Sequence, residues 1–274
     1  MTSAYPLPDT ALARRLEGWA VSDFAAYVPA CRADGVYPDA EALRVAGGVA
    51  VWFSEGNVMN GAFGLGMGDH PVEQEEVAAL IAFFERHGMA PTCDVCPHTD
   101  ASLLRWLAGY RFVATDFETV LYQPIPAALI TPPAAGVTVR VARTDEDRDL
   151  WAVLEARGFT DDAPTADHVQ LARDISRRSD ALLFIGSVDG EPAGTGMLVI
   201  SHGIAAFNGD STLPAMRNRG VQSAILAERL VHAEAAGCEL ALIEAAPGGT
   251  SQRNQVRAGF RVAYTRVSLV RAAG

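Results

Sequence analysis

Lysine is missing from this sequence, in which all 22 basic residues among 274 are arginine. Its absence excludes sites built on a lysine amine: Walker-type phosphate loops, protein-kinase sites, and Schiff-base or pyridoxal phosphate enzymes. Basic charge is also scarce, because 33 acidic residues give a net charge of −11. This balance argues against nucleic acid or an anionic membrane as a partner. An anion site in this chain must therefore rely on arginine and backbone amides.

Long apolar runs and closely spaced cysteines are rare as well. No segment approaches the roughly 18–20 apolar residues of a membrane helix, and the N-terminal residues lack the basic-then-apolar order of a secretory signal. Of four cysteines, only Cys93 and Cys96 lie close together. We therefore expect a soluble cytoplasmic protein with reduced thiols and no membrane partner.

A proline-rich segment divides the chain nearly in half. QPIPAALITPPAAG, residues 123–136, holds four prolines and no charge, which is typical of an ordered but non-helical connector. We predict a first domain at residues 1–124, a linker at 125–136 and a second domain at 137–274.

The two halves resemble each other at an offset of 150 residues. AGYRF at 108–112 corresponds to AGFRV at 258–262, and the amphipathic segment 72–91 aligns with 221–240. Each amphipathic segment runs into a glycine placed like a helix C-cap. We interpret this as an internal duplication.

The hydrophobic pattern and the cap residues of the second half predict both strands and helices. Asp189-Gly190 is typical of a hairpin turn. This pattern predicts an α+β fold with a mixed, largely antiparallel sheet flanked by helices. The expected strands are 137–142, 181–200 as a hairpin, 203–213, 239–245 and a last one from 260; the expected helices are 144–157, 166–178, one from 220, and 251–257.

One segment has the features of an anion site. In STLPAMRNRGVQSAILAERL, residues 211–230, a strand ends, a loop rich in Arg and Asn follows, and a helix begins near Gly220. The first-turn amides of a helix lack partners inside it, and the helix dipole adds positive potential there. Arg217 and Arg219 add charge, so the segment predicts a diphosphate site. No G-x-G-x-x-G follows the first strand, which disfavours a dinucleotide.

This segment resembles the acyl-CoA site of GCN5-related N-acetyltransferases (GNAT), whose pattern ends in [Arg/Gln]-x-x-Gly-x-[Gly/Ala]. Residues 212–222 follow the pattern, except that Gln222 stands where the family has Gly or Ala. The resemblance covers about 137–271, and a weaker version covers about 19–122. It implies two tandem GNAT-like domains, of which the N-terminal copy is degenerate.

The resemblance implies acetyl-CoA as the acyl donor and no metal. Its pantetheine arm would enter a splayed gap between parallel strands at 203–213 and 239–245, and the loop amides would hold the pyrophosphate. The cofactor-binding residues implied are Thr212, Leu213, Arg217, Asn218, Arg219, Gly220, Val221, Gln222, Ser223 and Asn254.

Transfer to an amine needs a base, because an ammonium has no lone pair, and the departing CoA thiolate needs an acid. The resembled family often has a tyrosine four residues before the Gly-Phe turn, where this chain has Gln255. We predict Tyr264 as the acid, Glu244 as the base and Asn254 as a polar contact. Asp210 and a water chain remain alternatives for the base.

Charge differs between the halves. Residues 1–130 carry 7 Arg against 16 acidic residues, and residues 131–274 carry 15 against 17. The first copy's loop, residues 64–77, has no arginine and several acids, so a diphosphate would be repelled there. We expect only the second copy to bind CoA.

Three functions follow from these patterns. The first is an N-acetyltransferase that moves an acetyl group from acetyl-CoA to an amine of a small molecule or peptide, directly in a ternary complex. The second is a CoA-binding sensor or scaffold without transfer. The third is a metal or redox module built on Cys93, Cys96 and His98. Either a monomer or a homodimer is compatible with the sequence.

Overall fold

The computed structural model describes residues 5–127, 130–160 and 163–273. Compactness separates them into two units: unit 1 holds residues 122–244 and 253–261 with Tyr5, and unit 2 holds residues 6–121, 245–252 and 262–273. In chain order the elements are α1 (Thr10–Ala33), β1 (Glu41–Val45), β2 (Gly48–Trp52), β3 (Gly61–Phe63), α2 (Gln74–Arg86), β4 (Thr92–Val95), α3 (Ala101–Gly109), β5 (Phe112–Pro124), β6 (Val137–Val141), α4 (Asp145–Phe159), α5 (Ala166–Ser176), β7 (Ala181–Val188), β8 (Glu191–Ser201), β9 (Ile204–Thr212), a 3-10 turn (Pro214–Met216), α6 (Val221–Ala235), β10 (Leu240–Ala245), α7 (Thr250–Arg257) and β11 (Arg261–Arg271). Within the described ranges, no helix combines the length and apolar character needed to cross a membrane.

Unit 1 is built on a mixed sheet. β6, β7, β8 and β9 follow one another as antiparallel neighbours. β7 and β8 form the predicted hairpin, and its turn residues Asp189 and Gly190 have positive φ of 52° and 88°, as a type I′ turn requires. β10 lies parallel to β9. The predicted α+β class is confirmed.

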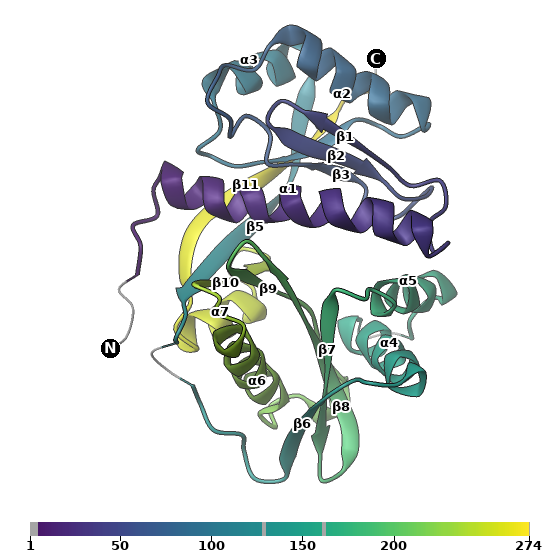
Figure 1. The fold of residues 1–274 in the computed structure, drawn as a ribbon, viewed down its shortest axis with the longest axis vertical. Helices are drawn as coiled ribbons and strands as arrows, with labels where there is room; N and C mark the ends of the chain where they lie inside the picture. The colour runs from purple at the N-terminus through teal and green to yellow at the C-terminus, as the bar shows by residue number, and fades with distance from the viewer. Residues whose placement is uncertain (1–4, 128–129, 161–162, 274) are drawn as a thin grey trace. The chain divides into compact units, whose positions relative to one another are not determined.

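Helices cover both faces of the sheet in unit 1. α4 begins after Thr144, which forms a capping box with Asp147, and it packs against β8, β9 and α5. α6 packs against β7, β8 and β9. Figure 1 shows α6 and the α4–α5 pair on opposite sides of these strands. Successive residues of β9 point to these opposite faces: Asp210 binds a side chain of α6, and Ser211 donates to a carbonyl of α4.

Pairing between β9 and β10 stops partway along the strands. The register runs from Leu240 opposite Ile204 to Ile243 opposite Phe207, whereas β9 continues to Thr212. The predicted parallel pairing is confirmed. The segment of β9 from residue 208 to residue 212 is called below the unpaired end of β9, because it pairs with β8 and no longer with β10.

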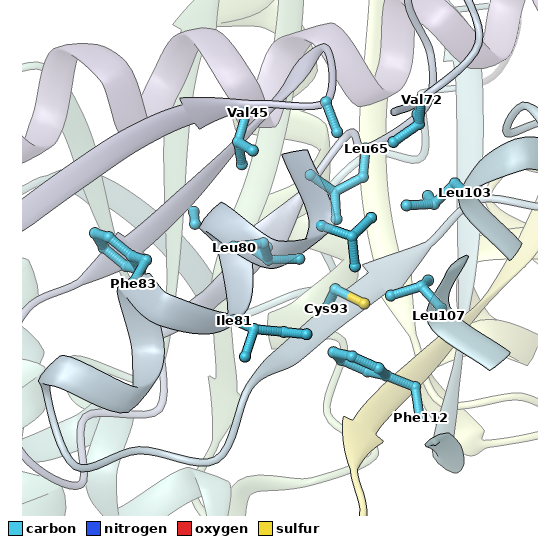
Figure 2. Close-up of a cluster of buried hydrophobic side chains, with 14 of the residues drawn as sticks. Val45, Leu65, Val72, Leu80, Ile81, Phe83, Cys93, Leu103, Leu107 and Phe112 are labelled. Carbon is cyan, nitrogen blue, oxygen red and sulfur yellow. The ribbon is translucent and has the colours of Figure 1, made fainter. Parts of the chain in front are cut away.

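In unit 2, β1, β2 and β3 form an antiparallel sheet against which α1 and α2 pack. β11 pairs antiparallel with β4, and Val267 lies opposite Val95. Figure 2 shows the apolar core of this unit, to which α2 contributes Leu80 and Phe83 and α3 contributes Leu103. Burial of this apolar cluster is the main driving force for the folding of unit 2.

The order of elements repeats along the chain as the sequence predicts. α2, β4, α3 and β5 are followed in the second half by α6, β10, α7 and β11. The last strands are exchanged between the copies, however. β11 pairs with β4 of the first copy, whereas β5 ends in unit 1, where the Ile125 amide donates to the Glu239 carbonyl at 2.9 Å.

The predicted domains, 1–124 and 137–274, are defined by the sequence duplication, and this division stays a prediction. The compact units interleave along the chain because of the exchanged strands. Within the predicted linker 125–136, residues 128–129 lie outside the described residues.

Candidate functional site

The predicted phosphate site lies in unit 1, where residues 213–220 form a tight loop between β9 and α6, called here the anion loop. Asn218 and Gly220 both have positive φ, 63° and 85°, a conformation that Asn and Gly adopt most readily. A Cβ on Gly220 would also lie 3.1 Å from the Cβ of Ala134. The path of the loop therefore depends on this glycine.

The start of α6 can receive an anion. Its N-cap is Gly220, which offers no side-chain acceptor, and the described first turn holds no acidic residue. The amides of Val221, Gln222 and Ser223 have no partner inside the helix, and the helix dipole adds positive potential at this end. A diphosphate fits this arrangement without any lysine.

Arg217 and Arg219 brace the anion loop. Nε of Arg217 donates to the Thr212 carbonyl at 3.3 Å, and its Nη2 donates to the Gly158 carbonyl at 3.4 Å. Arg219 forms an ion pair with Asp189 at 2.7 Å, with side-chain exposures of 45% and 67%. Both predicted arginines thus lie at the loop, and their contacts fix its course as well as supplying charge.

Gln222, the departure from the resembled pattern, turns toward α7. Nδ2 of Asn254 donates to Oε1 of Gln222 at 3.1 Å, and Nη1 of Arg257 donates to Oδ1 of Asn254 at 3.2 Å. Ser223, Asn254 and Arg257 also line a pocket of about 150 Å³ between α6 and α7. Three predicted residues, Gln222, Ser223 and Asn254, therefore lie together.

Thr212 and Leu213 lie where β9 passes into the anion loop. Besides the Arg217 contact to the Thr212 carbonyl, the Leu213 amide donates to the Ala193 carbonyl at 2.9 Å. These two backbone groups hold the strand end in place, and the roles predicted for them toward a cofactor stay predictions.

The two acidic candidates for the base differ in their surroundings. Glu244 is half-buried and directly follows Ile243, the last residue of β10 that pairs with β9. Asp210 is bound by the buried guanidinium of Arg229, whose Nη1 donates to its carboxylate at 2.9 Å. The arginine keeps Asp210 as the partner of a cation, and the role of Glu244 as a base stays a prediction.

Tyr264, the predicted acid, belongs to unit 2 and is buried. Its hydroxyl donates to the Glu17 carboxylate at 2.7 Å, and Nε of Arg266 donates to the same oxygen at 2.8 Å. Burial and the neighbouring Glu17 raise the pKa of Tyr264 above its usual range. The sequence alone did not indicate this partner from α1.

Gln255 occupies the position where the resembled family often has its tyrosine. Its side chain is fully buried within α7 and its surroundings, although the helix around it is strongly polar. A buried amide can neither donate a proton as an acid nor reach a ligand in solvent.

The Cys93 and Cys96 thiols are both buried and unlinked. Burial raises the pKa of Cys93, and raises that of Cys96 to about 12. Figure 2 shows Cys93 among apolar side chains such as Ile81, Leu107 and Phe112. Among the described residues, no three His, Cys, Asp or Glu side chains gather as a metal site would need. The geometry around Cys93 fits a packing role.

In the first copy, carboxylates already occupy the corresponding helix start. Glu76 in the first turn of α2 accepts from the amides of Glu73 at 2.9 Å and Ala46 at 3.0 Å. Glu75 and Glu76 place negative charge in the first turn of α2, where the first turn of α6 has none. The observation supports the expectation that the first copy does not bind a diphosphate.

Sequence reasoning missed three residues near the site. Arg229 lies on the apolar face of α6, where a charged residue among Ile225 and Leu226 was the available signal. Asp189 was noticed only as a turn residue, and its ion pair with Arg219 is long-range. Glu155 sits one position beyond Leu154 in α4 and gave no sequence signal.

No protein-family model matches the chain, and no curated protein matches it. Solved structures do. A GCN5-related N-acetyltransferase from Kribbella flavida aligns with a TM-score of 0.65 at 18% identity, over 91% of this chain and 96% of that one. A tandem GNAT protein from the clavulanic acid biosynthesis pathway gives 0.61 at 14% identity, over 86% and 85%. A GCN5-related N-acetyltransferase from Sphaerobacter thermophilus gives 0.58 at 18% identity, over 86% and 77%.

Proposed function

Since this chain has the fold of GCN5-related N-acetyltransferases, in a form that also aligns with a tandem member, we propose that it is an acyl-CoA-dependent N-acetyltransferase. It moves an acetyl group from acetyl-CoA to an amine of a small molecule or peptide, by direct attack in a ternary complex. The start of α6, with Gly220 as its N-cap and a first turn free of acidic residues, carries the proposal.

The binding half of the proposal follows from the anion loop. The amides of Arg217 to Gln222 receive the pyrophosphate, and the two loop arginines add charge beside it. Ser223 and Asn254, which line the pocket between α6 and α7, contact the remainder of the cofactor. Of the two corresponding helices, α6 has a first turn free of acidic residues, whereas α2 carries Glu75 and Glu76 there. We therefore propose one acetyl-CoA per chain.

The chemical half needs a neutral amine and a protonated leaving group. Glu244, beside the last paired residue of β10, is proposed to take a proton from the acceptor. Tyr264, the acid predicted from the sequence, belongs to unit 2 and donates its hydroxyl to Glu17, so its role toward the CoA thiolate stays a prediction. Backbone donors at the unpaired end of β9 would stabilise the oxyanion.

Calorimetry with CoA and thiol release from acetyl-CoA test the two halves separately. We expect one site per chain, loss of binding in Gly220→Val, and thiol release that depends on an added amine. Asn218→Gly serves as the matched loop variant, because glycine keeps the positive φ at that position. Two sites per chain would reject the assignment of one copy.

A second candidate is a CoA-binding sensor without transfer. The buried Gln255, at the position where the resembled family often has a tyrosine, favours it. Binding of CoA with no thiol release across a panel of amines would select this candidate.

A further inference from the structure

α4 brings one carboxylate to the unpaired end of β9. A Cβ on Gly209 would lie 2.7 Å from the Trp151 ring, and a Cβ on Gly158 would lie 2.7 Å from Oγ of Ser211. These close approaches show which face of α4 meets the strand. Glu155 follows Trp151 by one turn and precedes Gly158 by one turn, so it lies on this same face.

The two faces of β9 belong to different helices. Asp210 meets Arg229 of α6, and the next residue, Ser211, donates to the Leu154 carbonyl of α4 at 3.2 Å. The anion loop leads into α6, which puts the proposed acyl-CoA on the α6 side (Figure 1). An amine must approach the thioester carbon from a direction that the donor does not fill. The α4 side is the one that remains.

Glu155 has the electrostatics of a proton acceptor. It is half-buried, without a cationic partner among the described residues, and burial raises the pKa of its carboxyl to about 7. Burial is the whole cause, so no neighbouring charge sets this pKa. The charged and titratable groups on the segments packed against α4 are Asp167, His168, Arg173 and Asp174 of α5, Glu191 of β8, Asp210 of β9, and Arg217 of the anion loop, which donates to the Gly158 carbonyl.

We propose that Glu155 binds the ammonium of the acceptor and takes its first proton, which leaves the second nitrogen proton for Glu244. This inference rests on the proposed transferase function and makes the acceptor a cationic amine. The ammonium passes one proton to the Glu155 carboxylate, and the lone pair so freed forms the bond to the acyl carbon. The carbon–sulfur bond breaks, and its electron pair stays on the CoA sulfur. The second nitrogen proton passes by way of Glu244 to the sulfur, and Glu155 returns its own proton to water.

Glu155→Gln, which keeps the shape and removes the charge, tests the role. Acetyl-CoA is combined with spermidine, tyramine or a peptide with a free N-terminus, and with an aromatic amine that is already neutral at pH 7. We expect kcat/KM for the alkylamines at pH 7 to fall about 10²-fold or more. The rise of the wild-type rate through about pH 7 should also disappear. The aromatic amine should be acetylated at an unchanged rate, because it is already neutral and has no ammonium proton for Glu155 to remove.

Glu234→Gln, an exposed position on α6, is the matched control and should keep the wild-type pH profile. Calorimetry with acetyl-CoA runs in parallel on all variants. An unchanged pH profile in Glu155→Gln, or equal losses for alkyl and aromatic amines, overturns the role of Glu155 alone. A wild-type protein that fails to bind acetyl-CoA, or that binds it and acetylates no amine, rejects the transferase itself.

Discussion

Asp210→Asn probes the charge pair between Asp210 and the buried Arg229 in unit 1. The Arg229 side chain is 0% exposed and that of Asp210 is 15% exposed. Arg229 also donates to the Met197 carbonyl at 3.2 Å, and its guanidinium lies 4.6 Å over the Phe207 ring. The substitution leaves these contacts in place and removes the negative charge. A buried cation then remains without its counter-charge.

Removing one partner of a buried ion pair costs about 3–5 kcal/mol. The partial exposure of Asp210 lets water replace some of the lost interaction, so we expect the lower end, about 3 kcal/mol. A double variant, Asp210→Asn with Arg229→Met, should be more stable than Asp210→Asn alone. It no longer buries an uncompensated charge, and apolar replacements of buried pairs are often neutral.

Urea unfolding of the full chain measures the loss, together with amide hydrogen exchange of β8 and β9. Exchange reports the local free energy of opening even where the two units unfold separately. Asp149→Asn is the matched control: that side chain is 74% exposed and pairs with Arg173 only at 4.0 Å, so we expect less than about 1 kcal/mol. A loss below about 1 kcal/mol for Asp210→Asn would refute the reasoning.

Three further predictions concern the site. Asp189→Asn keeps the left-handed turn but removes the negative charge that pairs with Arg219. Because this ion pair is exposed and weak, calorimetry should show CoA binding only about 2–5-fold tighter. Weaker binding would contradict this prediction. Gln222→Ala breaks the 3.1 Å hydrogen bond to Asn254, so thermal unfolding should show a loss of about 1 kcal/mol in the free energy of unfolding. CoA affinity should be unchanged. A loss of affinity would mean that the Gln222 side chain itself contacts the ligand. Glu155→Gln should gain stability over the wild type as pH rises from 4.5 to 7, because the wild-type carboxyl, with its raised pKa, must ionise while buried. Denaturant titrations should show a gain of about 2 kcal/mol, and an equal stability across this range would disprove the buried titration.

Local features of the fold were predictable from the sequence. The start of α6 at Gly220, the turn at Asp189-Gly190 and the cap of α4 at Thr144 all depend on residues within a few positions of one another. Because the two halves of the sequence resemble each other, the order of elements predicted for the second half also predicted the order in the first. The anion loop was predictable for the same reason, since strand end, loop and helix start are contiguous in the chain.

The partners of individual side chains were not predictable, because they depend on contacts across the fold. Tyr264 was the nearest tyrosine to the Gly-Phe turn, yet its hydroxyl binds Glu17, 247 positions away in the chain. Gln222 departs from the resembled pattern, and only the position of Asn254 on α7 shows which way its side chain turns. The raised pKa of Glu155 arises from burial, which a single sequence does not report.

The exchanged strand has a consequence for how the protein is made. β4, against which β11 pairs, leaves the ribosome long before β11 is synthesised. The ion pair between Glu17 and Arg266 can likewise form only after β11 is made. Until then β4 of the nascent unit 2 lacks its β11 partner, and Glu17 lacks the counter-charge of Arg266. Such an intermediate is prone to pair with other chains. Unit 2, although it begins at the N-terminal side, must therefore be among the last parts of the molecule to complete its fold.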